Sequence, residues 1–336
     1  MKTIFYDIKE NEFNYLSENI PSNLEPYFFK IPLNSNTFID EKFIDAVAIS
    51  VFVQSELNKK VLEQFKNLKY IFLRSTGFSN VDLKYCKDNN IKVFNVPEYG
   101  SFTVAEYVFA LILSLNRKIS KAQNDILKGD INYENLTGFD LNKKTIGIVG
   151  LGKIGRKVLN IAYGFNMEAL VYDINNVGAY NYVEFDELLK KSDYIVITCP
   201  LTNQTRKMIN KFTLNLVKKT SFLINVARGE IVDTFALYKA LLNKKLQGAA
   251  LDVTECEELL CQNFDKCQKQ NNIKEFCYKK YFFIKKLIEL ENVIITPHNA
   301  YNTVEANKRI IDVTMKNIIQ VINKQEKPSY DNLVLL

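Results

Sequence analysis

The sequence predicts an α/β protein with two domains, each built on a doubly wound parallel sheet. The chain has 336 residues, which is more than one ordinary hydrophobic core holds. Short apolar segments of strand type alternate with amphipathic segments of helix type, as in parallel sheets covered by helices. Within residues 145–173, a strand pattern, a glycine-rich turn, a helix pattern and a second strand pattern follow one another.

The first domain begins at the N-terminus. Four short apolar segments predict strands, and the amphipathic segment 58–66 predicts a helix between two of them. The predicted strands cover residues 3–7, 46–53, 70–74 and 92–95.

A long helix is predicted at residues 103–129, where apolar residues recur at helical spacing after Pro97 and Gly100. We expect this helix to lead the chain into the second domain. Beyond it lie six predicted strands, the number that a complete dinucleotide-binding sheet requires. They cover residues 145–149, 169–172, 193–198, 221–225, 247–251 and 292–296.

The last part of the chain is predicted to be mainly helical. Between the final two strands, residues 281–289 have a helical pattern, and a further helix is predicted at 303–324 after Pro297. The second of these helices is expected to return the chain to the first domain. The predicted domains are therefore residues 1–100 together with 299–336, and residues 101–298.

The glycine-rich turn carries the first functional prediction. Gly150 allows a tight turn, Gly152 lets backbone amides approach a pyrophosphate, and Gly155 lets the helix lie close to its strand. The phosphates are expected to rest on the helix N-terminus. Asp173 ends the second strand, where an acid accepts hydrogen bonds from an adenosine ribose. Because no Arg or Lys follows it directly, NAD is predicted rather than NADP.

Composition excludes several classes of partner. The net charge of +6 comes from 44 basic and 38 acidic residues that are spread along the chain without a basic block, so no nucleic-acid partner is expected. No apolar run approaches the roughly 18 residues that cross a bilayer, and the N-terminus turns polar too early for a signal peptide. We therefore expect a cytoplasmic protein that does not contact membranes.

The cysteines are expected to be reduced thiols in that compartment, since they lack CxxC spacing. Four of the six lie within residues 256–277, but without regular spacing or a histidine among them they predict no metal site. The six are Cys86, Cys199, Cys256, Cys261, Cys267 and Cys277.

Three short segments that follow predicted strands carry groups suited to hydride reduction of a 2-oxo acid. Arg228 lies in NVARGEIVD, Glu257 ends ECE after GAALDV, and His298, the only histidine, lies in ITPHNAYNT. A guanidinium binds a carboxylate in bidentate fashion. An imidazolium protonates the developing alkoxide, and a neighbouring carboxylate favours its charged form. Each residue alone also has an ordinary structural explanation, but the three together favour this chemistry.

These motifs resemble the D-2-hydroxyacid dehydrogenase family and, within it, the fermentative NAD-dependent D-lactate dehydrogenases. Further matches are LRSTGFSNVDL, VFNVPEYGSFTVAEY, LTGFDLNKKTIGIVGLGKIGR and CPLTNQTRKMIN. The resemblance implies a flavodoxin-like substrate domain, a Rossmann NAD-binding domain and an active site in the cleft between them. It also implies reversible reduction of pyruvate to D-lactate by a homodimer, with the helix from Thr103 at the interface.

Site residues follow from the same resemblance, position by position. The catalytic residues are Arg228, Glu257 and His298, with His298 as proton donor and acceptor. The implied substrate-binding residues are Thr76, Gly77, Tyr99, Phe52 and Tyr301. The implied cofactor-binding residues are Gly150, Gly152, Lys153, Ile154, Gly155, Asp173, Cys199, Pro200, Thr205, Val226, Ala227, Arg228 and Asp252.

Some positions depart from the family pattern. Tyr107 and Cys199 each replace a frequent histidine, and Asn302 replaces a frequent aromatic residue beside the pocket. The sequence therefore leaves two alternatives open. One is a dehydrogenase for a bulkier 2-oxo acid of the 2-oxoisocaproate type, and the other is a dinucleotide-sensing, corepressor-like binding module.

Overall fold

The strands form two parallel sheets in the computed structural model, which describes residues 1–257, 275–323 and 332–334. The chain forms two compact units, one of Met1–Tyr99 with Asn302–Leu336 and the other of Gly100–Tyr301. Each unit contains one sheet, as predicted. No helix in the described parts of the chain is both long enough and apolar enough to cross a membrane.

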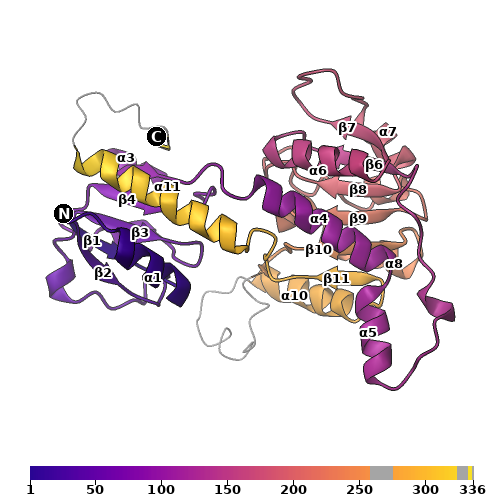
Figure 1. Cartoon of the computed structure of the whole chain (residues 1–336), viewed down its shortest axis with the longest axis horizontal. Coiled ribbons are helices and arrows are strands. Elements are labelled where there is room, and N and C mark those ends of the chain that lie inside the picture. The colour runs from indigo at the N-terminus through magenta and orange to yellow at the C-terminus, as the bar shows by residue number, and fades with distance from the viewer. Residues whose placement is uncertain (258–274, 324–331, 335–336) are drawn as a thin grey trace. The chain divides into compact units, whose positions relative to one another are not determined.

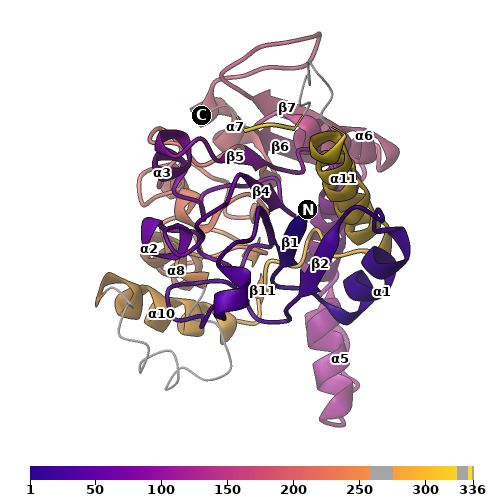
Figure 2. The same ribbon diagram turned by 90° about the vertical axis from the view of Figure 1, so that its left-hand side faces the viewer.

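The first unit contains a five-stranded sheet in the order β2-β1-β3-β4-β5, the order of flavodoxin-like folds. Alternate residues of each strand point to opposite faces. Ile4 therefore packs in the core on the α2 and α3 side, whereas Phe5 packs in the core on the α1 and α11 side (Figure 2). The elements are β1 (Lys2–Phe5), α1 (Glu10–Asn19), β2 (Glu25–Phe28), η1 (Glu41–Phe43), β3 (Ala48–Val51), α2 (Lys59–Leu62), β4 (Tyr70–Leu73), α3 (Leu83–Asp88), β5 (Lys92–Phe94) and α11 (Val304–Ile322).

Strand β2 was not predicted from the sequence. Its segment, EPYF, contains Pro26, none of its four residues is fully buried, and it lies at the edge of the sheet. A strand with this composition is found only where one side needs no ladder hydrogen bonds.

The second unit contains a six-stranded sheet in the order β11-β10-β9-β8-β6-β7 (Figure 1). All six predicted strands are present. Helices α4 and α6 share a core with one face, and α7, α8 and α10 contribute to the core on the other. The elements are α4 (Ser101–Asn116), α5 (Ile119–Leu127), η2 (Glu134–Leu136), β6 (Thr145–Val149), α6 (Lys153–Gly164), β7 (Glu168–Tyr172), α7 (Phe185–Lys191), β8 (Tyr194–Ile197), η3 (Thr213–Asn215), β9 (Phe222–Asn225), η4 (Gly229–Ile231), α8 (Thr234–Leu242), β10 (Gly248–Leu251), α10 (Glu275–Ile288) and β11 (Val293–Ile295).

The single helix predicted at 103–129 is wrong. The chain forms α4 and α5 with a break at Arg117 and Lys118, where Lys118 adopts left-handed backbone angles (φ 50°). A left-handed residue cannot continue a right-handed helix. Most residues of α4 are buried, whereas no residue of α5 is, so the two helices differ in environment.

Candidate active site

The glycine-rich turn lies where the strand order of the second sheet reverses. From β6 the chain passes to β7 on one side and then to β8 on the other, which makes the carboxyl ends of β6 and β8 a topological switch point. Gly150 follows β6 with φ +98°, and a Cβ there would lie 2.6 Å from the backbone nitrogen of Cys199, just beyond β8. The turn therefore requires glycine for its conformation and for its contact with the next strand.

The other two glycines have different roles. A Cβ on Gly155 would lie 2.2 Å from the carbonyl oxygen of Gly150, so close packing of α6 on the turn excludes any side chain. A Cβ on Gly152 would meet nothing within 4 Å. Gly152 is the N-cap of α6, whose first turn contains Lys153 and Ile154. The open space beside the amides of a helix N-terminus fits the pyrophosphate of a dinucleotide.

Asp173 is fixed beside this turn. Its Oδ2 accepts a 2.6 Å hydrogen bond from the backbone N–H of Leu151, and its Oδ1 accepts one of 2.8 Å from Asn175. The carboxylate thus joins the end of β7 to the glycine-rich turn. Because each carboxylate oxygen has a second lone pair, the group can also accept hydrogen bonds from a ribose.

The remaining cofactor candidates are close to the ends of β8 and β9. Cys199 is buried against Gly150, and Thr205 Oγ donates a 2.7 Å hydrogen bond to the carbonyl oxygen of Pro200. Val226 and Ala227 are buried directly after β9. Burial raises the pKa of the Cys199 thiol to about 11, so this thiol is protonated at neutral pH.

Arg228 is exposed on a loop that begins at the end of β9. Within this loop, Asn225 accepts a 3.1 Å hydrogen bond from the N–H of Ala227 and donates one of 3.0 Å to the carbonyl of Arg228. A Cβ on Gly229 would lie 2.0 Å from the carbonyl of Thr254. The Arg228 loop therefore packs directly on the loop that leads to Glu257.

The side chains of His298 and Glu257 are in direct contact. The imidazole Nδ1 lies 3.0 Å from Oε1 of Glu257, and the two side chains are 44% and 41% exposed. Both side chains therefore remain accessible to solvent and to a ligand. His298 follows β11 and has left-handed backbone angles (φ 52°), which turn the chain sharply after the strand. The sole imidazole and its predicted carboxylate partner thus meet in the folded chain.

Asp252 holds the turn that carries His298. Its side chain is buried, and its two oxygens accept hydrogen bonds from the Thr296 hydroxyl (2.6 Å) and from the N–H groups of Asn299 (2.8 Å) and Ala300 (2.9 Å). Its carbonyl accepts another from the N–H of His298 (2.8 Å). The family resemblance implied Asp252 as a cofactor contact, and this structural role was not predicted.

The loop before Glu257 has two connections to α10. A disulfide joins Cys256 to Cys277, and the buried Glu255 forms a 2.7 Å ion pair with Lys280. The prediction of reduced cysteines is therefore wrong for this pair, because the fold brings two residues of irregular spacing to a Cα separation of 5.8 Å. Cys86 and Cys199 are free and buried, whereas Cys261 and Cys267 are outside the described residues.

Four substrate-binding candidates belong to the first unit, where each lies in a loop that follows a strand. Thr76 donates a 2.7 Å hydrogen bond to the carbonyl of Val96, and the Gly77 carbonyl accepts one from Ser75. The carbonyl of Tyr99 accepts a hydrogen bond from Arg309. Phe52 is buried, with its N–H directed at Asp7. In the second unit, Tyr301 is half-buried against the α4 core.

Arg74, two residues before Thr76, was not singled out from the sequence. Its guanidinium is fully buried and donates to the carbonyls of Tyr6 (2.6 Å) and Asp7 (2.9 Å) and to the hydroxyl of Ser50 (3.0 Å). An arginine directly after a buried strand, with no acid nearby in sequence, was the available signal.

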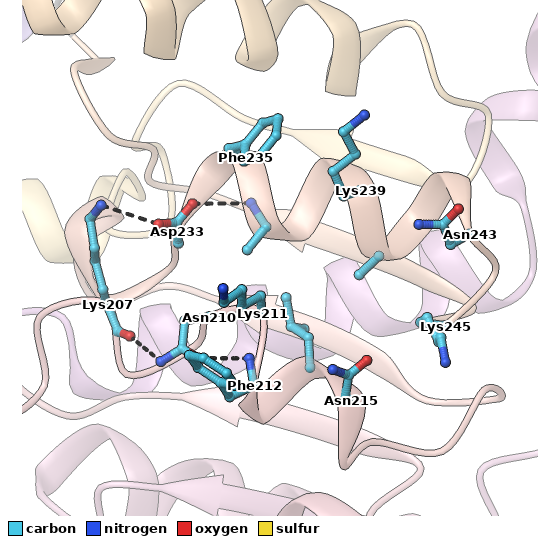
Figure 3. Close-up of a pocket in the computed structure, with 13 residues that line it drawn as sticks. Lys207, Asn210, Lys211, Phe212, Asn215, Asp233, Phe235, Lys239, Asn243 and Lys245 are labelled. Atoms are coloured by element: carbon cyan, nitrogen blue, oxygen red, sulfur yellow. Dashed lines mark hydrogen bonds and ion pairs between the residues drawn. The ribbon is translucent and has the colours of Figure 1, made fainter.

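A separate pocket of about 560 Å³ lies between η3 and α8 (Figure 3). Its lining includes Lys207, Lys211, Lys239 and Lys245, but no residue of the glycine-rich turn and none of the three catalytic candidates. Lys207 reaches Asp233 at 3.1 Å, and this hydrogen bond raises the pKa of the lysine. The pocket is therefore distinct from the site that contains His298.

The second sheet carries a glycine-rich turn at its switch point and an imidazole and carboxylate pair beyond the carboxyl ends of its other strands, as expected of a dinucleotide-dependent oxidoreductase. A family model described as "D-isomer specific 2-hydroxyacid dehydrogenase, NAD binding domain" matches residues 109–300. The chain belongs to this family. It is an oxidoreductase, and NAD is its cofactor.

Individual relatives cover nearly the whole chain. D-lactate dehydrogenase kk1H of Curvularia clavata is 34% identical over 95% of this chain and 91% of its own. D-lactate dehydrogenase from Aquifex aeolicus, solved with NAD and lactic acid, aligns with a TM-score of 0.86 and 32% identity over 99% of this chain and 98% of its own. D-2-hydroxyisocaproate dehydrogenase aligns with a TM-score of 0.83 and 26% identity, over 99% of each chain.

Proposed function

We propose that this enzyme reduces pyruvate to D-lactate with NADH, reversibly. The observation that carries the proposal is the 3.0 Å contact of the sole histidine with Glu257. Both residues lie, like Arg228, on loops that follow the carboxyl ends of strands in the second sheet. These are the groups needed to bind and protonate a 2-oxo acid. The similarity to enzymes named as D-lactate dehydrogenases supports pyruvate as the substrate.

The catalytic residues have distinct roles in this proposal. The Arg228 guanidinium binds the substrate carboxylate in bidentate fashion and polarises the keto group. Bound NADH supplies the hydride to C2. Because Glu257 lies on the Nδ1 side of the ring, Nε2 of His298 faces the substrate and gives its proton to the keto oxygen. The Glu257 carboxylate, which contacts Nδ1, holds the ring in position.

Other residues are assigned to binding. We propose that the predicted substrate domain, residues 1–100 and 299–336, corresponds to the unit of residues 1–99 and 302–336. The proposed substrate contacts are Thr76, Gly77, Tyr99 and Phe52 in this unit and Tyr301 at the end of the other unit. The amides of the turn that contains Thr76 and Gly77 would bind the substrate carboxylate. The proposed NAD contacts are Gly150, Gly152, Lys153, Ile154, Gly155, Asp173, Cys199, Pro200, Thr205, Val226, Ala227, Arg228 and Asp252.

The test is an NADH-oxidation assay with pyruvate, followed by chiral analysis of the lactate. We expect D-lactate as the product and a loss of about 10²- to 10⁴-fold in kcat for His298→Gln, since that is the usual contribution of a general acid. Lys143→Gln, a matched change at an exposed surface position, should leave kcat unchanged. L-lactate as product, or parental kcat in His298→Gln, would contradict the proposal.

A bulkier 2-oxo acid is the second candidate, favoured by the alignment with D-2-hydroxyisocaproate dehydrogenase. Comparison of kcat/KM for pyruvate and 2-oxoisocaproate separates the two substrates. Pyruvate should have the higher value. Absence of turnover with either acid, together with measurable NADH binding, would instead support a dinucleotide-sensing module.

We further propose that the enzyme acts as a cytoplasmic homodimer. The segment from α5 to η2 exposes large apolar side chains that a second copy could cover, including Ile126 (61% exposed), Leu127 (74%) and Tyr133 (80%). Light scattering after size exclusion should give twice the mass of the chain. An Ile126→Asp, Leu127→Asp variant should elute as a monomer, whereas a monomeric parent enzyme would disprove the proposal.

A further inference from the structure

Cys256 directly precedes the carboxylate that contacts the histidine. Its disulfide partner, Cys277, lies in the first turn of α10, and the Cα atoms are 5.8 Å apart. Glu257, the next residue, has its carboxylate 3.0 Å from Nδ1 of His298. The bond that fixes residue 256 therefore also limits where the Glu257 side chain can lie.

A buried ion pair holds the residue on the other side of Cys256. Glu255 is 3% exposed and accepts hydrogen bonds from Lys280 (2.7 Å) and from the N–H of Thr234 (3.0 Å). Lys280 lies three residues after Cys277, so both connections start from the same face of α10. The ion pair would keep Glu255 in place without the disulfide, whereas residues 256 and 257 would gain freedom.

The backbone conformation of Cys256 is a second reason to expect residues 256 and 257 to move when the disulfide is broken. Its φ is +53°, a left-handed conformation that is disfavoured for a residue with a Cβ and persists only where the surroundings impose it. With the disulfide broken, residue 256 can relax to negative φ. That rotation would displace the following Glu257 carboxylate relative to the imidazole.

We propose that Cys256–Cys277 is a redox-modification site, and that thiol–disulfide exchange there controls the Glu257–His298 contact. The consequence for catalysis rests on the proposed function. The co-reactant is a dithiol reductant. One of its thiolates attacks the sulfur of Cys256, which is half-buried, whereas Cys277 is only 7% exposed.

The thiol–disulfide exchange takes place in two steps. The first attack breaks the Cys256–Cys277 bond, forms a mixed disulfide at Cys256 and releases Cys277 as a thiolate that takes up a proton. The second thiol of the reductant then displaces Cys256 and closes its own disulfide. Two electrons pass to the protein, and the two cysteines end as thiols. The disulfide form has the Glu257–His298 contact, so it is the more active form.

The first experiment measures the redox state of the Cys256–Cys277 disulfide and the activity of the enzyme in the same buffers. The full-length enzyme is equilibrated in buffers of reduced and oxidised dithiothreitol, quenched with an alkylating reagent and analysed by peptide mass spectrometry. Parallel samples give kcat, KM for pyruvate and the Kd of NADH. We expect kcat to fall about tenfold as Cys256 and Cys277 become alkylated, with the Kd of NADH unchanged. Alkylation of both cysteines without a change in kcat would overturn the proposal.

A second readout does not depend on turnover. Because the chain has one histidine, the NMR resonance of its ring reports on His298 alone. We expect this resonance to shift between oxidised and reduced enzyme at constant pH, and Glu257→Gln to abolish the difference. If pyruvate were not a substrate, this shift would still test the site. Identical spectra for the two forms of the parent enzyme would refute the proposal.

Matched double variants identify which cysteines cause the response of kcat to the redox buffer. A Cys256→Ser, Cys277→Ser variant should have the reduced enzyme's kcat in every buffer. A Cys261→Ser, Cys267→Ser variant should respond as the parent does. A redox response that survives loss of Cys256 and Cys277, or that is lost with Cys261 and Cys267, would overturn the assignment. The titration of the parent enzyme remains decisive if a variant fails to fold.

Discussion

The backbone N–H of His298 donates a 2.8 Å hydrogen bond to the carbonyl oxygen of Asp252. Because the carboxylate of the same aspartate accepts three more hydrogen bonds from residues 296–300, one buried residue fixes the whole turn. A histidine on such a turn is oriented by contacts that leave its ring accessible.

Asp252→Asn should therefore lower both stability and kcat. An amide nitrogen cannot accept a hydrogen bond, so at least one N–H or hydroxyl of the turn loses its partner at a cost of about 1–3 kcal/mol. Urea denaturation measures the stability and steady-state kinetics give kcat. Thr296→Ser keeps the donated hydroxyl and serves as the control. Parental stability in Asp252→Asn would show that the turn does not depend on this carboxylate.

Arg228→Lys should raise KM for pyruvate and lower kcat, because a point charge cannot reproduce the planar fork that binds a carboxylate. The combined loss in kcat/KM is expected to be on the order of 10²-fold, the usual effect of removing one preorganised donor. Initial rates over a range of pyruvate concentrations separate the two parameters. Arg117→Lys, at an exposed position at the end of α4, should change neither.

Asp173→Ala should weaken NADH binding by about 10- to 100-fold, because the ribose would lose its hydrogen bonds to a charged acceptor. NADPH should lose less affinity, since its 2′-phosphate cannot donate to a carboxylate. Fluorescence titration with each nucleotide gives both values. Asp173 also accepts the N–H of Leu151, so the same loss for both nucleotides would indicate disturbance of the turn rather than loss of a ribose contact.

Local patterns predicted much of this fold. Strand β6 has the predicted bounds, and the other strands of its sheet agree within one residue at either end, because buried parallel strands are short, continuous apolar runs between polar turns. Gly150 and Gly155 were predictable because local geometry excludes a side chain at each, whereas Gly152 was predicted from the space that a pyrophosphate needs. The break at Lys118 was not, since the left-handed residue there is neither glycine nor asparagine.

Long-range pairings could not be predicted in the same way. Cys256 and Cys277 meet only after α10 packs beside the loop that follows β10, and sequence spacing does not specify such a pairing. The hydrogen bonds from Asp252 to residues 296–300 depend on the register between β10 and β11. The pairing of His298 with Glu257 was predicted because only one imidazole is available and both residues follow strands of one sheet.

The ion pair of Glu255 and Lys280 provides a last prediction, about stability. Both side chains are at most 10% exposed, so removal of the lysine leaves a buried carboxylate without its cation. Lys280→Met should lower the free energy of unfolding by about 3–5 kcal/mol. Lys191→Met breaks the exposed pair with Glu187 and should cost less than about 1 kcal/mol.

A double variant, Glu255→Leu with Lys280→Met, separates the charge from the packing. Removal of both partners leaves no unpaired charge, so stability should recover toward that of the parent, because apolar replacements of buried ion pairs are often neutral or stabilising. Urea denaturation of the parent, both single lysine variants and the double variant measures these differences. If Lys280→Met were as stable as Lys191→Met, the ion pair would not hold the loop before Glu257, and the disulfide would be its main connection to α10.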